Sequence, residues 1–337
     1  MDVNEAEIQI LASLSILEAE SSPTDRRSLE ARGERYWIFK ENWDGAFEEL
    51  ISKNLVEGDQ SGYRLTGVGR PLGELYRGER PDMYWYYYQK FYSAARASAA
   101  HSKLCERVFG ENLCQEGQVE MESLEHLLSL LDLKGGERVL DLGCGAGVIS
   151  EYVSDKTGAT VTGLDYAASA IAEATERTKE KQHRLSFVQA NFNELKLTSK
   201  SLDAVISLDT LYWVADLEKT LSILSNALKQ GGRMGIFMNH HIGANHPSEH
   251  LEARHSKLSQ ALSALGLSCE TIDFTKAVGE FWHRIFEAAS DLRKEFEAEG
   301  NGFIAASLIR ESEEDYLPDI NEGRIARYLY LVRCYVA

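Results

Sequence analysis

The sequence Glu137-Arg-Val-Leu-Asp-Leu-Gly-Cys-Gly-Ala-Gly147 joins a strand pattern to the start of a helix. Apolar residues at 139–142 predict a short buried strand, and residues 148–153 predict the helix. Between them three glycines alternate, where the missing Cβ lets the backbone bend sharply and approach a ligand: Gly143, Gly145 and Gly147. Because the following helix adds free N–H groups at its first turn, we interpret this segment as a ligand-binding turn.

A second apolar segment, residues 160–165, ends in Asp165, 24 residues after Asp141. An acidic residue about 20 residues beyond such a turn receives ribose hydroxyls in nucleotide-binding βαβ units. The dinucleotide fingerprint is not met, because Val148 occupies its sixth position. Asp141 would repel a pyrophosphate but attract a ligand with an amine and a sulfonium. For the glycines taken alone, a turn without a ligand is the alternative.

With three further segments, this chain resembles the class I S-adenosylmethionine-dependent methyltransferases over about residues 105–337. The residues that carry the resemblance are Asp141–Gly147, Gly163–Asp165, Gln189–Asn193, Leu202–Trp213 and Leu228–Phe237. The resemblance implies an α/β fold, a Rossmann-like doubly wound sheet of seven strands. It also implies S-adenosyl-L-methionine as the cofactor and S-adenosyl-L-homocysteine as its product.

The apolar pattern predicts strands that alternate with helices, at 139–142, 160–165, 185–189, 202–208 and 233–238. Such alternation indicates parallel pairing with right-handed crossovers, and ligands then gather at the carboxyl ends of the strands. Residues 246–265 are expected to be helical, with a sixth strand at 268–274 and a last strand at 327–337. A helical insertion at about 276–313 is where small-molecule methyltransferases commonly build a lid, and its candidates are Trp282, His283, Arg284 and Arg293.

Three regions are expected along the chain: a winged-helix-like domain at 1–80, a helical connector and active-site cap at 81–125, and the cofactor domain at 126–337. In the first, helices at 6–17 and 46–55 precede a β-ribbon at 56–69. This domain carries 10 Lys and Arg against 16 Asp and Glu, a charge that phosphates would repel. We therefore expect it to serve packing or homodimerisation.

The composition favours a cytoplasmic protein. The chain has 337 residues and a formal net charge of −17, which argues against nucleic acid or an anionic membrane as partner. No apolar run is long enough to span a membrane, and the first residues lack the pattern of a signal peptide. Five scattered cysteines show no metal-ligand spacing, so no metal site is expected.

Cofactor-binding residues are expected at the strand ends. Asp165, followed by Tyr166, would hold the ribose, the glycine turn would lie along the methionine part, and Asp141 would favour its ammonium group. By resemblance, Asn191 and Phe192 would frame the adenine, with Leu208 at the end of the next strand.

The expected partner is a small-molecule methyl acceptor. Asp209 aligns with an aspartate near the acceptor amine in phosphoethanolamine methyltransferases, while Trp213 stands where that family has a histidine. Because tryptophan cannot take a proton, transfer to nitrogen or sulfur is favoured. Asp209, Tyr88 and His241 are the catalytic candidates.

The sequence leaves two other functions open: an O-methyltransferase with His240 or His241 as base, and a regulator that senses the cofactor. The connector aromatics, Tyr84–Tyr88 with Phe91 and Tyr92, could cap the cleft and attract a cation, or wedge between two domains.

Overall fold

The computed structural model describes residues 2–36, 43–79 and 84–334. The chain divides into two compact units, Met1–Lys90 and Phe91–Ala337. The division falls within helix α5 (Trp85–Ala97), ten residues beyond the boundary expected at residue 80. That expected boundary and the first residues of the connector, 81–83, lie outside the described residues.

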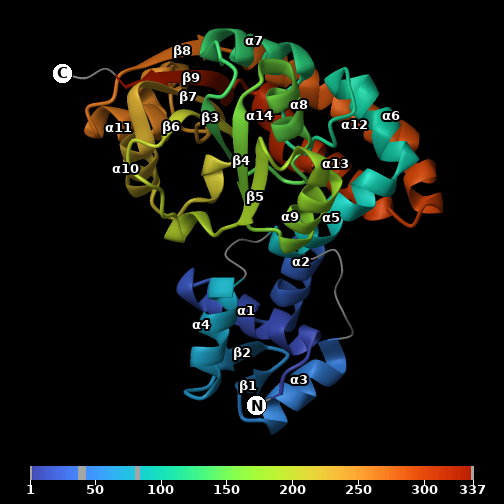
Figure 1. Ribbon diagram of the computed structural model, residues 1–337. Coiled ribbons are helices and arrows are strands. Elements are labelled where there is room, and N and C mark those ends of the chain that lie inside the picture. Colours follow the sequence, from blue (N-terminus) through green and yellow to red (C-terminus); the bar gives the residue numbers. More distant parts are fainter. Residues whose placement is uncertain (1, 37–42, 80–83, 335–337) are drawn as a thin grey trace. The chain divides into compact units, whose positions relative to one another are not determined.

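The first unit is a small helical domain with a ribbon (Figure 1). Its elements are α1 (Glu5–Ala19), α2 (Arg26–Tyr36), α3 (Trp43–Ser52), the antiparallel β1 (Val56–Asp59) and β2 (Gly62–Leu65), and α4 (Gly69–Glu79). Asn4 caps α1, and Ile10, Leu14 and Phe47 are buried in a core that belongs to this unit alone. Both helices and the ribbon expected here are present, although α3 begins and ends three residues earlier. The winged-helix assignment stays a prediction.

The second unit contains one sheet of seven strands in the order β5-β4-β3-β6-β7-β9-β8. Each expected strand is present: β3 (Arg138–Leu142), β4 (Thr160–Asp165), β5 (Leu185–Gln189), β6 (Leu202–Leu208), β7 (Leu228–His241), β8 (Cys269–Asp273) and β9 (Ile325–Arg333). β3 to β7 pair in parallel, as predicted for these five strands, and β9 runs antiparallel to both of its neighbours, β7 and β8. The last residues expected in β9, 335–337, lie outside the described part.

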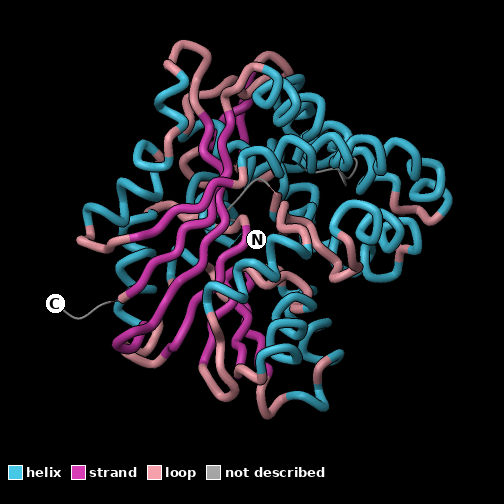
Figure 2. Tube along the Cα trace, turned by 90° about the horizontal axis from the view of Figure 1, so that it is seen from above, coloured by secondary structure: helices cyan, strands magenta, loops and turns pink. Residues whose placement is uncertain are grey.

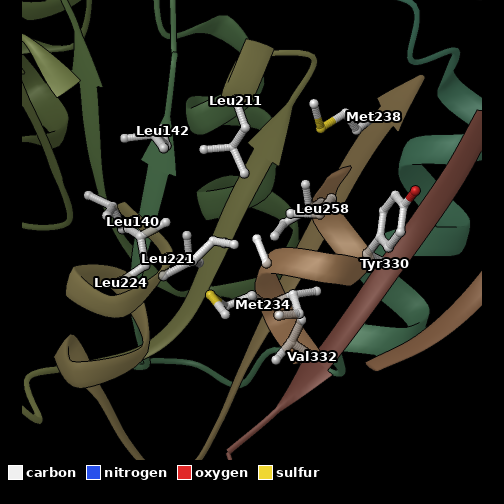
Figure 3. Close-up of a cluster of buried hydrophobic side chains, with 14 of the residues drawn as sticks. Leu140, Leu142, Leu211, Leu221, Leu224, Met234, Met238, Leu258, Tyr330 and Val332 are labelled. Atoms are coloured by element: carbon white, nitrogen blue, oxygen red, sulfur yellow. The ribbon is translucent and has the colours of Figure 1, made fainter. Parts of the chain in front are cut away.

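Helices cover both faces of this sheet, as Figure 2 shows. Because strand side chains alternate, Leu140 and Leu142 face one core while Val139 and Asp141 face the other. In the first core Leu221 and Leu224 of α10 (Leu217–Ala227) pack beside Leu140, with α11 (Lys257–Ala264) next to them (Figure 3). The second core packs against α7 (Met121–Leu131) and α8 (Val148–Thr157). This alternation places Asp141 beneath α8.

Further helices of the second unit connect or flank these strands. They are α6 (Ala99–Phe109), α9 (Ala168–Arg177), and the short helices η1 (Lys179–Lys181), η2 (Phe192–Glu194) and η3 (Leu211–Trp213). Ser98 caps α6, because its hydroxyl accepts a hydrogen bond from the N–H of His101 at 2.9 Å. The insertion before β9 is longer than expected and stays helical to residue 321, through α12 (Thr275–Ala298), α13 (Gly302–Arg310), η6 (Glu311–Tyr316) and α14 (Leu317–Asn321).

The helix expected at 246–265 is broken. Two short helices, η4 (Ser248–Leu251) and η5 (Ala253–His255), precede α11. Glu252 and Ser256 have extended backbones with ψ of 140° and 147°, which ends each helix at that point, and Ser256 then caps α11. Among the described residues, no helix combines the length and apolar character needed to cross a bilayer.

Candidate active site

The glycine turn has a backbone that other residues adopt only with strain. Gly143, Gly145 and Gly147 have φ of 83°, 52° and 70°, all in the left-handed region. The N–H groups of Gly143 and Cys144 both donate to the carbonyl of Leu164, at 2.8 and 3.0 Å. These bonds tie the end of β3 to the end of β4, so the turn lies at the carboxyl edge of the sheet.

The atoms packed around the same glycines also leave no room for a side chain. A Cβ on Gly143 would lie 2.1 Å from Oγ1 of Thr210, and one on Gly147 would lie 2.3 Å from the ring of Phe187. On Gly145 it would lie 2.5 Å from Cε1 of Tyr92. The turn is therefore closely packed from three directions by β5, the loop after β6 and α5, as a backbone cradle for a ligand requires.

Asp165 ends β4 with its carboxylate held by the main chain. Oδ2 accepts the N–H of Gly145 and Oδ1 accepts that of Ala167, each at 2.9 Å. Burial raises the pKa of Asp165, and backbone hydrogen bonds from Ala167, Gly145 and Tyr166 act against that rise. A carboxylate has about four acceptor positions, so Asp165 can still accept a ribose hydroxyl. Tyr166 follows, and its carbonyl accepts the side-chain amide of Gln189 at 3.1 Å.

Asp141 is buried on the face of β3 that α8 covers, with 4% of its surface exposed. The hydroxyl of Ser150 donates to its Oδ2 at 2.5 Å. Burial raises the pKa of Asp141 to about 6, to which the charge of Asp165 adds, while the bond from Ser150 lowers it. A carboxylate in this position gains from a nearby cation, so the site fits the ammonium group of an amino acid moiety.

The residues expected around the adenine make contacts within the protein. Asn191 caps η2, because its Oδ1 accepts the N–H of Asn193 at 3.0 Å. Phe192 is buried among Leu140, Leu142 and their neighbours in one core of the sheet. Leu208 is half-buried at the end of β6 and packs against the other core. Their contacts with a base stay predictions.

Tyr92 of α5 lies against the glycine turn, and the sequence named it only among the connector aromatics that could cap the cleft. Its ring is the nearest group to the Cβ position of Gly145. Burial, followed by the charges of Asp165 and Glu116, raises the pKa of Tyr92 well above its ordinary value. The run of aromatic residues in the connector was the available signal, but the prediction selected Tyr88. Because Tyr88 belongs to the first compact unit, its place in the site stays a prediction.

Asp209 forms a buried ion pair with Arg327 of β9. Its Oδ1 and Oδ2 accept Nη1 and Nη2 of Arg327 at 2.6 and 2.9 Å, and the two side chains are 7% and 3% exposed. Oδ2 also accepts the N–H of Gln118 at 2.8 Å. Asp209 holds φ at 56°, a left-handed conformation in which its neighbours keep it. Both oxygens are thus engaged by groups of the protein.

Gln118 links this ion pair to the helical insertion. Its Oε1 accepts Nδ2 of Asn239 at 2.9 Å and Nε1 of Trp282 at 3.1 Å, and its Nε2 donates to the hydroxyl of Tyr316 at 3.1 Å. Trp282 and Tyr316 stack with ring centroids 3.8 Å apart. Asn239 also accepts Nη1 of Arg327 at 2.8 Å. This network is formed by single polar residues that lie far apart in the chain, so no local sequence motif could predict it.

The two histidines at the end of β7 have separate partners. Nε2 of His240 contacts the carbonyl of His250 at 2.7 Å, and burial lowers the pKa of His240. His241 is exposed, with its Nδ1 2.8 Å from Oδ2 of Asp319.

Apart from Trp282, the lid candidates of the helical insertion lie at the surface or in ion pairs. Arg284 pairs with Glu120, Arg293 pairs with Glu297, and His283 is exposed. Across residues 2–36, 43–79 and 84–334, no group of three or more His, Cys, Asp or Glu could hold a metal ion.

Comparison with known proteins agrees with this geometry. Residues 140–236 match the family model for a methyltransferase domain. Methyltransferase phqN of Penicillium fellutanum is 27% identical over 161 residues, 46% of this chain and 49% of that protein. Phosphoethanolamine N-methyltransferase 2 of Caenorhabditis elegans is 33% identical over 134 residues, 40% of this chain and 30% of that protein. The alignments with these two curated relatives thus span no more than about half of their length.

A solved structure extends the comparison to the fold. Phosphoethanolamine N-methyltransferase 2 of Haemonchus contortus, in complex with phosphomonomethylethanolamine and S-adenosylhomocysteine, superposes with a TM-score of 0.54. The two are 21% identical, and the match covers 74% of this chain and 60% of that one. The second unit thus has the Rossmann-like methyltransferase fold, as the sequence predicted. Within the residues that match the methyltransferase-domain model, the glycine turn and Asp165 stand at the carboxyl edge of the sheet.

Proposed function

We propose that this protein is an S-adenosylmethionine-dependent methyltransferase that transfers the methyl group to nitrogen or sulfur of a small molecule. The observation that carries the proposal is the left-handed glycine turn between two buried carboxylates, Asp141 and Asp165, at the carboxyl edge of a parallel sheet. The matching methyltransferase domain supports the reaction class.

The residues of the turn fit this cofactor. Asp165 would accept the ribose hydroxyls, the glycine backbone would lie along the methionine part, and Asp141 would face its ammonium group. Asn191, with Phe192 and Leu208 beside it, would border the adenine, and Tyr166 would adjoin the ribose. S-adenosylmethionine supplies a methyl group on a sulfonium, whose leaving group needs no further activation.

The protein then has to orient the acceptor and exclude water. Tyr92 covers the turn at Gly145, and the network around Gln118 holds α12 and η6 against the strand ends. Amines and thioethers need only a free lone pair, whereas hydroxyl acceptors usually need a base. Both oxygens of Asp209 accept bonds from Arg327 and Gln118, which suits a positioning residue and supports nitrogen or sulfur.

Calorimetry with S-adenosylhomocysteine tests the cofactor assignment. Asp165→Ala should lower its affinity at least a hundredfold, because the ribose hydroxyls lose their acceptor. Asp291→Ala, at an exposed position on α12, is the matched control and should bind like the wild type. Equal affinities in the two variants would contradict the proposal. Incubation with labelled cofactor and pooled small metabolites, followed by mass spectrometry, would then identify the acceptor.

O-methylation is the second candidate, favoured by the 2.8 Å contact between His241 and Asp319. A carboxylate that holds a histidine in this way can orient it as a base. Loss of turnover in His241→Ala or His240→Ala, with cofactor affinity intact, would favour this reading. Turnover equal to that of the wild type in both variants would exclude it.

The charge of the first unit also bears on how subunits assemble. We infer a cytoplasmic homodimer whose first unit pairs subunits, because the negative charge of that unit disfavours nucleic acid. Sedimentation velocity of the full chain tests the dimer, and a monomer at micromolar concentration would contradict it.

A further inference from the structure

An ion pair between α5 and α9 lies beside the glycine turn (Figure 1). Nε of Arg96 on α5 donates to Oε1 of Glu173 on α9 at 2.7 Å. The next residue of α9 is Ala174, whose Cβ lies 3.0 Å from the Cβ position of Gly147. The ion pair therefore holds Arg96 near the second half of the turn.

A second arginine contacts the turn directly. Nη2 of Arg177, at the end of α9, donates to the carbonyl of Ala146 at 2.6 Å, and its Nη1 pairs with Glu151. Burial lowers the pKa of Arg177 and the positive charge of Arg96 lowers it further, which places the two guanidinium groups close together. An anion beside both arginines would relieve this repulsion.

Both arginines keep N–H groups that none of the described residues uses. A guanidinium has five N–H donors, and Glu173 takes only the one on Nε of Arg96. Nη1 and Nη2 of Arg96 make no hydrogen bond to any residue in the described part of the chain. Nε of Arg177 is buried and also has no partner among these residues. The outer edge of Arg96 can therefore donate two parallel hydrogen bonds to a carboxylate, while Glu173 already fixes the side chain.

The proposed cofactor carries a group that needs such donors. Its amino-acid part has an ammonium group, which Asp141 would face, and a carboxylate. The buried acids at the edge of the sheet, Asp141 and Asp165, would repel this carboxylate. Because a carboxylate that leaves water is costly without a cation or N–H groups to receive it, the protein has to supply donors close to the turn.

We propose that Arg96 binds the carboxylate of the methionine part of the cofactor through Nη1 and Nη2, with Arg177 beside it. The inference rests on the proposed function and adds the residue that recognises the amino-acid end of the cofactor. Tyr92, one helical turn before Arg96, packs on Gly145, so α5 covers the same end of the turn. The protein therefore discriminates against adenosine compounds that lack the carboxylate.

Two ligands that differ only in the carboxylate test the assignment. S-adenosylhomocysteine carries it, whereas 5′-(3-aminopropylthio)-5′-deoxyadenosine keeps the adenosine, the thioether and the amine without it. Both are titrated calorimetrically into the full chain. The wild type should bind S-adenosylhomocysteine about tenfold more tightly or better, because only this ligand offers an anion to Arg96. Equal affinities of the wild type for the two ligands would overturn the proposal.

Variants assign the difference to Arg96. Arg96→Met should weaken S-adenosylhomocysteine about tenfold and change the affinity for the amine ligand less than about twofold. Arg96→Lys, whose ammonium group cannot donate two parallel bonds, should weaken S-adenosylhomocysteine by a smaller factor and serves if the first variant does not fold. Arg107→Met removes an exposed arginine of α6 that pairs with Asp291, and this matched control should bind both ligands like the wild type.

A purely structural role for Arg96 predicts a different pattern. In either variant, equal weakening of the two ligands or an unchanged affinity for S-adenosylhomocysteine would overturn the proposal. Failure of the wild type to bind S-adenosylhomocysteine would instead refute the proposed function.

Discussion

Burial destabilises the ionised form of Asp141 in the protein without a ligand. It is buried under α8 with one hydrogen bond, from Ser150, and burial raises its pKa to about 6. The carboxylate of Asp165 is also buried but accepts two backbone N–H groups. Of the two acids, Asp141 therefore has more to gain from a cationic ligand group.

Cofactor affinity should consequently depend on pH. The pKa of Asp141 in the folded protein lies above the ordinary 3.8, so this carboxyl is ionised above about pH 6 and takes up a proton as the pH falls through about 6. An ammonium group prefers the ionised form. S-adenosylhomocysteine affinity should therefore be constant above pH 7 and fall towards tenfold per pH unit below 6. Calorimetry between pH 5 and 8 measures this, with Asp141→Asn expected to be nearly independent of pH. A wild-type affinity that is flat over this range would contradict it.

At the scale of elements, the glycine turn depends on a side chain from a distant helix. Tyr92 of α5 packs on Gly145, while Thr210 and Phe187 pack on the other two glycines. The backbone of the turn is therefore fixed by β3 and β4, and side chains from neighbouring elements pack against it.

Gly145→Ala should destabilise the protein by about 2–4 kcal/mol and weaken S-adenosylhomocysteine, since its Cβ meets the ring of Tyr92 at 2.5 Å and φ is 52°. Gly266→Ala is the control: its φ is 69° but open space surrounds it, so only the backbone strain of about 1–2 kcal/mol applies. Urea denaturation measures both. Tyr92→Ala should reduce the cost of Gly145→Ala in a double-mutant cycle, and additive effects would argue against the contact.

The ion pair of Asp209 and Arg327 joins the loop after β6 to β9. Arg327→Met should lower the free energy of unfolding by about 3–5 kcal/mol, because it leaves the carboxylate of Asp209 buried without a partner. Arg293→Met removes an exposed pair with Glu297 and should cost less than about 1 kcal/mol. Chemical denaturation compares the two. If Asp209→Asn added to Arg327→Met brings no recovery, the unpaired charge is not the cause.

At the scale of the whole molecule, the chain comprises two units that each have a hydrophobic core. The residues that pack around the glycine turn and Asp209 come from segments as distant as Tyr92 and Arg327. The antiparallel β9 brings Arg327 beside Asn239 of β7, so the last strand supplies part of the site.

Hydrogen exchange should respond in one unit more than in the other. S-adenosylhomocysteine stabilises the structure that binds it, so amides of the sheet in residues 91–337 should exchange more slowly with the ligand. Amides of α1 and α3, whose core lies within residues 1–90, should change little. Mass spectrometry of exchange, with and without ligand, measures both. Equal protection in α1 and in β3 would show that the two units open together.

Local sequence patterns were enough to predict the strands of the sheet and the glycine turn at its carboxyl edge. Apolar runs of strand length, separated by helices, predicted every strand of the second unit, because burial on both faces leaves a near-continuous apolar signal. The glycine turn and Asp165 were also readable, since only glycine tolerates that backbone and that crowding. The pattern did not show that β9 runs antiparallel, because direction in a sheet leaves no mark on apolar periodicity.

Tertiary structure alone decided which isolated side chains meet at that edge. Gln118, Asn239 and Arg327 stand in unrelated segments, and each looks ordinary in its own surroundings. Chain crossovers bring them around Asp209, while α5 brings Tyr92 onto Gly145. The turn could be predicted because backbone geometry and local crowding restrict its residues. The network could not, because the contacts that define it join residues far apart in the chain.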